Sequence, residues 1–388
     1  MKVFNHTKRF GFIILASLLT FSLAACDSAP TTSPNNAGIR YAEEEAVTTE
    51  IPYEQRDLIK IGGYYGTGGI TTYDPLVVAD KLGYFKTIRI EDEDIQAGPN
   101  ALAALVANRI QASHLQISIS TPAIARGSGL RVVAAAHGGE NTSNFHFYVP
   151  NDSPIKTVED LKGKKVGGVQ IGDSTYYALS NTLAKSGITI EDLELVTVPA
   201  GQTLQILEGG QLDGAGCWSD FEYRPIEERG GYRLLFTVFD ILPPGLIHCG
   251  LTVNGAWLDS KPEQVRELVE GFVKANTWLQ EHVEEGKQLH IDIAKERGLD
   301  PTLIEKYYTP VDIRPYSLTD DLDVEYFLYN FEKNGVIEPG LLKPSDIYTN
   351  EFNPFEWRFV PTNLSFAPYH NLPGETVKIK PATGSAAH

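Results

Sequence analysis

The sequence predicts an α/β fold of two lobes, each a mainly parallel sheet flanked by helices. Short apolar strands alternate with segments of helical periodicity, an order that places helices on both faces of a parallel sheet. The chain has 388 residues, a length typical of two domains. Residues 101–112 also resemble residues 203–215, because each segment predicts a helix, a turn and the start of a strand. This internal similarity favours two lobes of related structure.

The first lobe begins with an apolar strand at residues 59–65, which leads into a loop rich in Gly and Thr at 66–73. A helix follows at 75–82 and ends before Gly83. The later elements keep this alternation. They are helices at 101–107, 158–161 and 176–184 and strands at 132–135, 165–169 and 193–198.

Two further helices have distinct signatures. The segment 262–281 predicts a long amphipathic helix, because Val265, Leu268 and Phe272 recur at helical spacing. Pro122 follows a run of hydroxyl residues and suits the first turn of a helix. We therefore expect a helix to begin close to Pro122.

The N-terminal 25 residues predict a cleavable signal peptide. A positively charged start precedes an apolar run at residues 10–23, and small residues lead to Cys26. We expect cleavage before Cys26 and lipid attachment to its sulfur, against the alternatives of an uncleaved anchor or an ordinary secretory signal. Residues 26–56 are polar without hydrophobic periodicity, which predicts a flexible tether. The mature protein is therefore expected outside the cytoplasmic membrane, anchored by lipid on its periplasmic side.

The charge balance of the chain is strongly acidic. It has 33 Lys and Arg against 50 Asp and Glu, a formal net charge of −17, and signal cleavage would remove only positive charge. This balance argues against nucleic-acid binding and against docking onto anionic lipid headgroups.

The cysteines exclude a disulfide scaffold. Only Cys217 and Cys249 follow Cys26. Each lies in an apolar strand, so we expect two free, buried thiols, although the spacing leaves a single bridge open.

Several segments together resemble one family. They are residues 79–85 (Ala-Asp-Lys-Leu-Gly-Tyr-Phe), 153–167 (with Asp-Leu-Lys-Gly-Lys-Lys), 183–188, 210–215 and 274–279. Over residues 58–345 the chain resembles the lipid-anchored solute-binding proteins of bacterial ABC importers, in the subgroup for nitrate, sulfonates, taurine and thiamine-pyrimidine precursors. Gln111 departs from the family, which usually has Asp there, and residues after about 350 have no counterpart.

The resemblance implies the type II periplasmic binding protein fold, with a ligand cleft between two lobes. Lobe one would comprise residues 58–149 and 250–345, lobe two residues 150–249, and residues 346–388 a C-terminal extension. The implied partners are a small solute and the permease and ATPase subunits of an importer. The chain would act as a monomer, without a cofactor or metal.

The same fold implies where solute contacts lie, because ligands bind at the carboxyl ends of strands and at helix N-termini. Candidates occur in the loop after the first strand, before Pro122, at the start of the 176–184 helix and after the strand at 215–217. They are Tyr64, Tyr65, Thr72, Tyr73, Ser118, Ser120, Thr121, Asp173, Ser174, Thr175, Trp218 and Asp220.

Each candidate also has a structural explanation. Asp173 and its neighbours suit a helix cap, and the Tyr64 and Tyr65 rings could line a hinge. Trp218 could belong to the core and Asp220 to a solvated face. His248 could be a structural histidine whose ring nitrogens form hydrogen bonds within the protein. Both kinds of role stay open at these positions.

The sequence gives little support for an enzyme. A lipid-anchored hydrolase would need a nucleophile elbow and an Asp three residues before a late His, and neither pattern occurs. A phosphate-binding P-loop is also missing. We therefore expect a solute-binding protein of an importer, with a non-transport sensory binding module of the same fold as the alternative. Few candidate positions carry Lys or Arg, so an anion and a neutral or cationic ring such as an aminopyrimidine both remain open, and the family resemblance favours the anion.

Overall fold

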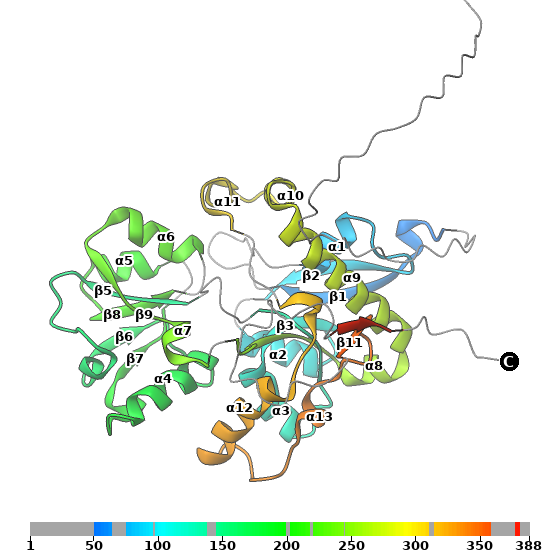
Figure 1. Cartoon of the computed structure of the whole chain (residues 1–388). Helices are drawn as coiled ribbons and strands as arrows, with labels where there is room; N and C mark the ends of the chain where they lie inside the picture. Colours follow the sequence, from blue (N-terminus) through cyan, green and yellow to red (C-terminus); the bar gives the residue numbers. More distant parts are fainter. Residues whose placement is uncertain are drawn as a thin grey trace, which may run out of the picture. The chain divides into compact units, whose positions relative to one another are not determined.

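The computed structural model describes residues 50–63, 75–95, 98–137, 145–198, 202–217, 220–243, 245–309, 314–357 and 377–380. They belong to a compact unit, Glu50–His388. They form two five-stranded sheets with helices around them and one two-stranded sheet (Figure 1). The signal peptide, Cys26 and the tether up to residue 49 lie outside the described residues.

The first sheet has the strand order β2-β1-β3-β10-β4. β1 is parallel to β2 and to β3, whereas β10 is antiparallel to its neighbours β3 and β4. The strands are β1 Asp57–Gly63, β2 Ile88–Asp94, β3 Ala112–Gln116, β4 Arg131–Ala135 and β10 Cys249–Val253. The sheet is completed by a strand that comes more than a hundred residues after the other four.

The second sheet repeats this arrangement with the order β7-β6-β8-β5-β9. β6 is parallel to β7 and β8, and β5 is antiparallel to β8 and β9. The strands are β5 His146–Pro150, β6 Lys165–Gly167, β7 Glu194–Val196, β8 Gly214–Cys217 and β9 Tyr232–Thr237. In both sheets the fourth strand is the antiparallel one. The predicted α/β class is therefore confirmed, with each sheet mixed instead of wholly parallel.

The internal similarity of the sequence corresponds to equivalent positions in the two sheets. Residues 101–112 contain the end of α2 (Gly98–Val106) and the start of β3, and residues 203–215 contain α5 (Thr203–Glu208) and the start of β8. β3 and β8 are each the third strand of their sheet.

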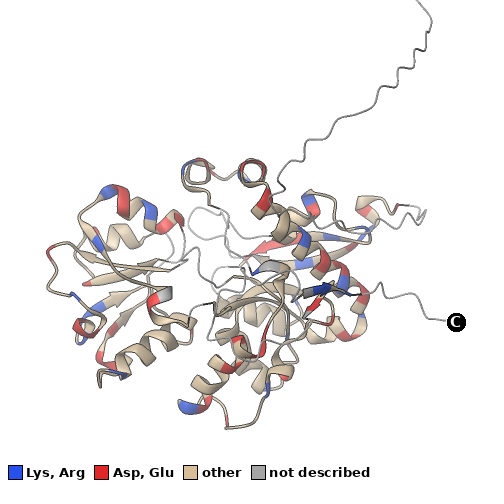
Figure 2. Ribbon diagram, in the orientation of Figure 1, with Lys and Arg blue, Asp and Glu red and all other residues tan. Residues whose placement is uncertain are grey.

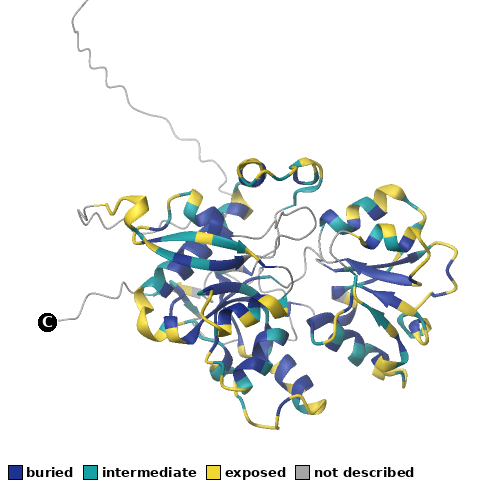
Figure 3. Cartoon of the chain, turned by 180° about the vertical axis from the view of Figure 1, so that it is seen from behind, coloured by how far each residue is buried: buried dark blue, intermediate teal, exposed yellow. Residues whose placement is uncertain are grey.

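The predicted helices occur where their patterns indicate. α9 begins at Pro262, where a missing N–H costs nothing, and it buries Val265, Leu268 and Phe272 on one face. The alternation of buried and exposed residues on such helices is visible in Figure 3. The other helices are α1 Pro75–Lys81, α3 Ile117–Ala125, α4 Ser174–Ala184, α6 Asp220–Arg229, α7 Val238–Ile241, α8 Gly255–Ser260, α10 Val283–Glu296, α11 Thr302–Tyr307, α12 Asp321–Lys333 and α13 Pro344–Ile347.

Several short elements complete the described part. Four are 3-10 helices, and the predicted helix at 158–161 is one of them. They and the small third sheet are η1 Tyr53–Gln55, η2 Val158–Leu161, η3 Ile190–Asp192, η4 Pro315–Ser317, β11 Phe355–Trp357 and β12 Val377–Ile379.

The expectation for Pro122 was wrong. Pro122 lies inside α3, which begins five residues earlier at Ile117, directly after β3 ends at Gln116. A Pro in that position removes the hydrogen bond to the carbonyl of Ser118. The helix tolerates this loss because it is short and its apolar face is buried. The hydroxyl residues before Pro122 are therefore helical.

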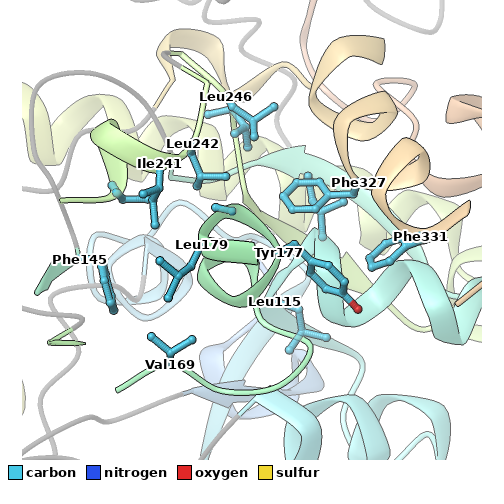
Figure 4. Packing of buried hydrophobic residues seen from close by; sticks show 14 of the residues in the cluster. Leu115, Phe145, Val169, Tyr177, Leu179, Ile241, Leu242, Leu246, Phe327 and Phe331 are labelled. Carbon is cyan, nitrogen blue, oxygen red and sulfur yellow. The ribbon is translucent and has the colours of Figure 1, made fainter. Parts of the chain in front are cut away.

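The apolar core extends from the second sheet to α12. Tyr177 of α4 meets Phe331 of α12 edge to face, with ring centroids 5.0 Å apart. Figure 4 shows the Tyr177 ring beside Phe327 and Phe331. A hydrogen bond of 2.6 Å from Asn181 Nδ2 to Asn330 Oδ1 joins the same two helices. Contacts with α12 therefore fix the position of α4, including its N-terminus.

A buried ion pair fixes the segment that leads into β10. The Arg314 guanidinium donates to the Asp323 carboxylate at 2.5 and 2.8 Å, and both side chains are at most 2% exposed. Arg314 also donates to the carbonyl of Gly245, and Asp323 accepts from the N–H of Ile247 at 3.0 Å. The pair therefore ties residues 245–247 to α12.

Four of the six interior strands of the two five-stranded sheets carry no charged side chain. β3, β10, β8 and β5 contain no Lys, Arg, Asp or Glu, and Figure 2 shows the charged residues mainly on helices and edge strands. Within the described ranges, no helix has both the length and the apolar character needed to cross a membrane.

Candidate functional site

Asp173 caps the N-terminus of α4. One carboxylate oxygen accepts from the N–H of Tyr176 at 2.6 Å, and the other accepts from the N–H of Gln170 at 3.2 Å. The side chain is buried, and desolvation raises its pKa to about 7 although these hydrogen bonds act in the opposite direction. Both oxygens therefore serve the backbone of the helix start.

Three donors converge on one amide oxygen beside this cap. Gln116 Oε1, at the end of β3, accepts from the N–H of Ser174 at 2.9 Å. The hydroxyls of Ser174 and Ser118 lie 3.4 and 3.3 Å from the same oxygen. The predicted residues Ser118 and Ser174 are thus brought together from α3 and α4, around a Gln that the sequence reasoning had not selected.

The remaining hydroxyl candidates differ in their partners. Ser120 Oγ lies 3.3 Å from the carbonyl of Ile117, so its hydroxyl is bonded within α3. The hydroxyls of Thr121 and Thr175 are fully buried and have no hydrogen-bond partner among the described residues. A buried hydroxyl without a partner costs free energy, and a bound polar group would supply the missing bond.

A cluster of three imidazoles and one thiol lies on and beside three adjacent strands of the first sheet. It consists of His114 in β3, His137 two residues after β4, His248 just before β10 and Cys249 at the start of β10. Ring centroids are 4.6 Å apart for His114 and His137 and 5.0 Å apart for His137 and His248. His248 Nδ1 lies 3.4 Å from both Cys249 Sγ and Ser174 Oγ. The cluster therefore adjoins the start of α4.

Burial keeps these groups uncharged at neutral pH. Desolvation lowers the pKa of His114 to about 4 and that of His248 to about 3, and it places the pKa of His137 well below its usual range. The pKa of the Cys249 thiol is raised well above its ordinary value by the same cause. The imidazoles thus keep a lone pair at neutral pH.

Asp220 is the first residue of α6 and is half-buried. Its carboxylate accepts from the Tyr223 hydroxyl and lies 3.8 Å from the Arg224 guanidinium. Desolvation raises its pKa to about 6, although Arg224 and Thr309 act in the opposite direction. Asp220 is therefore engaged within its own helix and with the segment after α11.

Five candidates lie outside the described residues, and their roles stay predictions. They are Tyr64, Tyr65, Thr72, Tyr73 and Trp218.

The two cysteines of the globular part are free and buried, which confirms the expectation of unpaired thiols. The sequence reasoning nevertheless missed the group around Cys249. Its members lie on β3, β4 and β10, which are neighbours only because β10 inserts between the other two. The available signal was the His-Cys pair at 248–249 entering an apolar strand.

Comparison with known proteins agrees with this architecture. The family model described as NMT1/THI5 like matches residues 71–286. A Bacillus subtilis (strain 168) protein named "Putative aliphatic sulfonates-binding protein" is 24% identical over 257 residues, which are 64% of this chain and 74% of that protein.

Solved structures with a similar fold include two bacterial binding proteins. The alkanesulfonate-binding protein SsuA from Xanthomonas axonopodis pv. citri, bound to MOPS, superposes with a TM-score of 0.59 at 20% identity, over 76% of this chain and 99% of that one. The periplasmic nitrate-binding protein NrtA from Synechocystis PCC 6803 gives a TM-score of 0.59 at 13% identity, over 77% and 87%. The fold is thus that of periplasmic binding proteins. Because the family model covers more than half of the sequence, this chain belongs to the NMT1/THI5-like family.

Proposed function

We propose that this protein is an extracytoplasmic solute-binding lipoprotein of an ABC importer. It would capture a small anion such as nitrate, a sulfonate, taurine or bicarbonate and deliver it to the permease. Family membership supports this role, as do the sulfonate and nitrate specificities in the names of its relatives. The proposal includes no enzymatic activity.

The observation that carries the choice of an anion is the group of donors around Gln116 Oε1. Two hydroxyls and one helical N–H point at a single oxygen at the N-terminus of an eleven-residue helix. Helix N-termini favour negative charge, and an oxyanion would accept the same three bonds once the Gln116 side chain moved aside. Asp173 turns both its oxygens to backbone N–H groups, and its raised pKa of about 7 reduces the negative charge that it carries at neutral pH, which limits its repulsion of an anion.

The domain organisation belongs to the same proposal. Residues 58–149 and 250–345 would form one lobe and residues 150–249 the other, with residues 346–388 as an extension. The solute would bind between the lobes, and hinge closure would trap it. Lipid on Cys26 would hold the protein to the membrane through the segment 26–56.

A solute panel tests the proposal. The unlipidated mature chain is titrated by calorimetry with nitrate, bicarbonate, taurine, an alkanesulfonate and an aminopyrimidine. We expect one of the anions to bind with a Kd on the order of micromolar. Replacing Ser174 and Thr175 together by Ala should weaken it by about 1–3 kcal/mol, because the bound oxygens lose partners.

Matched variants separate the anion site from other outcomes. Thr182→Ala removes a hydroxyl of the same helix that donates to the carbonyl of Ala178, and it should leave affinity unchanged. If affinity falls only in Tyr64→Ala or Trp218→Ala, the solute is a ring held by aromatic faces, and the anion assignment is wrong. Failure of every solute to bind would count against the transport role itself.

A further inference from the structure

Metal-ligating side chains meet on three adjacent strands of the first sheet. One ligand atom each of His114, His137 and Cys249 can be chosen so that all three lie within 4.8 Å of one another. β10 carries Cys249 and lies between β3, which carries His114, and β4, which His137 follows. Because strands are rigid supports, the three side chains are held in place by the pairing of the sheet.

The spacing suits a single small ion. A point equally distant from three atoms 4.8 Å apart lies about 2.8 Å from each, whereas zinc binds imidazole nitrogen at about 2.0–2.1 Å and thiolate sulfur at about 2.3 Å. Movements of less than about 1 Å in side-chain positions would close this difference. His114 and His137 are half-buried, so the group is not sealed within the core.

The donor set selects the kind of ion. Two imidazoles and a thiol lack the oxygen ligands that Mg²⁺ and Ca²⁺ require, and they match the preference of zinc and copper for nitrogen and sulfur. The Cys249 thiol would release its proton on binding.

We propose that His114, His137 and Cys249 form a binding site for one transition-metal ion of the Zn²⁺ type. Three protein ligands leave the fourth tetrahedral position open. His248 lies next to the site, with Nδ1 3.4 Å from Cys249 Sγ, and it connects the site to Ser174 at the start of α4. This assignment does not depend on which solute the protein carries.

Calorimetric titration of the tag-free mature chain with Zn²⁺ alone, after dialysis against a chelator, tests the site. We expect one equivalent to bind with a Kd on the order of micromolar or lower, and no binding of Mg²⁺. His137→Ala and Cys249→Ser should each weaken Zn²⁺ binding at least tenfold. The matched controls are His290→Ala, a buried histidine of α10, and Cys217→Ser, the buried thiol of the second sheet.

Cobalt provides a second readout, which begins with the unaltered protein. Co²⁺ bound to the unaltered protein should give a near-ultraviolet thiolate-to-metal charge-transfer band, and excess Zn²⁺ should remove it. The band should persist in Cys217→Ser and be absent in Cys249→Ser. Absence of stoichiometric Zn²⁺ binding would overturn the proposal, and so would a cobalt spectrum without thiolate character or an affinity lost only in the control variants.

Discussion

Replacing Asp323 by Ala should destabilise the protein strongly, because it leaves a buried positive charge without its counter-ion. The Asp323 carboxylate accepts two bonds from the Arg314 guanidinium and one each from the N–H groups of Ile247 and Asp320, at 2.5–3.0 Å. Both partners of the ion pair are at most 2% exposed, so water cannot replace the lost acceptor.

The expected loss is about 3–5 kcal/mol of unfolding free energy, the range for removing one partner of a buried ion pair. Arg314 would keep its contacts to the carbonyls of Gly245 and Leu318, neither of which carries a negative charge. Each buried N–H left without an acceptor costs about 1–3 kcal/mol, which supports the upper part of that range. This expected loss of unfolding free energy is a large share of the stability of a typical domain, which is about 5–15 kcal/mol.

Urea unfolding followed by circular dichroism and tryptophan fluorescence measures this loss. The double variant Arg314→Met with Asp323→Leu should lose less than Asp323→Ala, because it buries no charge. Glu228→Gln, at an exposed pair with Lys306, serves as the control and should leave the unfolding midpoint unchanged. A loss below about 1 kcal/mol in Asp323→Ala would refute the argument that the pair is isolated from solvent.

Three further outcomes follow from groups at other positions. Asp173 has a pKa raised from 3.8 to about 7, so its contribution to stability is present below pH 3.8 and is lost as pH rises through 7. Unfolding of Asp173→Asn at a series of pH values should show the variant gaining about 3–5 kcal/mol relative to the unaltered protein across that window, and parallel profiles would contradict the raised pKa. Cys26→Ala should leave the precursor unlipidated and move it from the membrane fraction to the soluble fraction, which fractionation of cells detects. Denatured, unreduced mature protein lacking the lipid-bearing residue should show two reactive thiols, Cys217 and Cys249, and none would mean a disulfide.

Much of the fold could be predicted from local patterns. The apolar stripe of α9 predicted that helix at 262–281. The similarity of residues 101–112 and 203–215 predicted two equivalent strands, β3 and β8, each of which is the third strand of its sheet. Pro122 was misleading because a Pro at a helix start and a Pro inside a short buried helix have the same local sequence. The burial of α3 allows Pro122 to lie inside the helix, and such burial cannot be predicted from the local sequence alone.

The site was less accessible to sequence reasoning. Ser118, Asp173 and Ser174 were selected from strand ends and a helix cap, and the structure brings Ser118 and Ser174 to one oxygen. Gln116 carried no motif, because a Gln at the end of a strand is unremarkable until its neighbours are known. The His114, His137 and Cys249 group depends on strand order, since β3 and β4 become partners of β10 only through pairing across distant sequence.

The position of β10 also determines when each sheet can form as the chain is made. All five strands of the second sheet come from residues 146–237, so that sheet is complete in sequence before β10 exists. β3 and β4 cannot be joined until residues 249–253 arrive, and Ala112 must then pair with Val253. Bringing such distant residues together is slow because the intervening chain must first be closed into a loop. Of the two five-stranded sheets, the N-terminal one is therefore completed later, and until then β3 and β4 carry unpaired backbone edges.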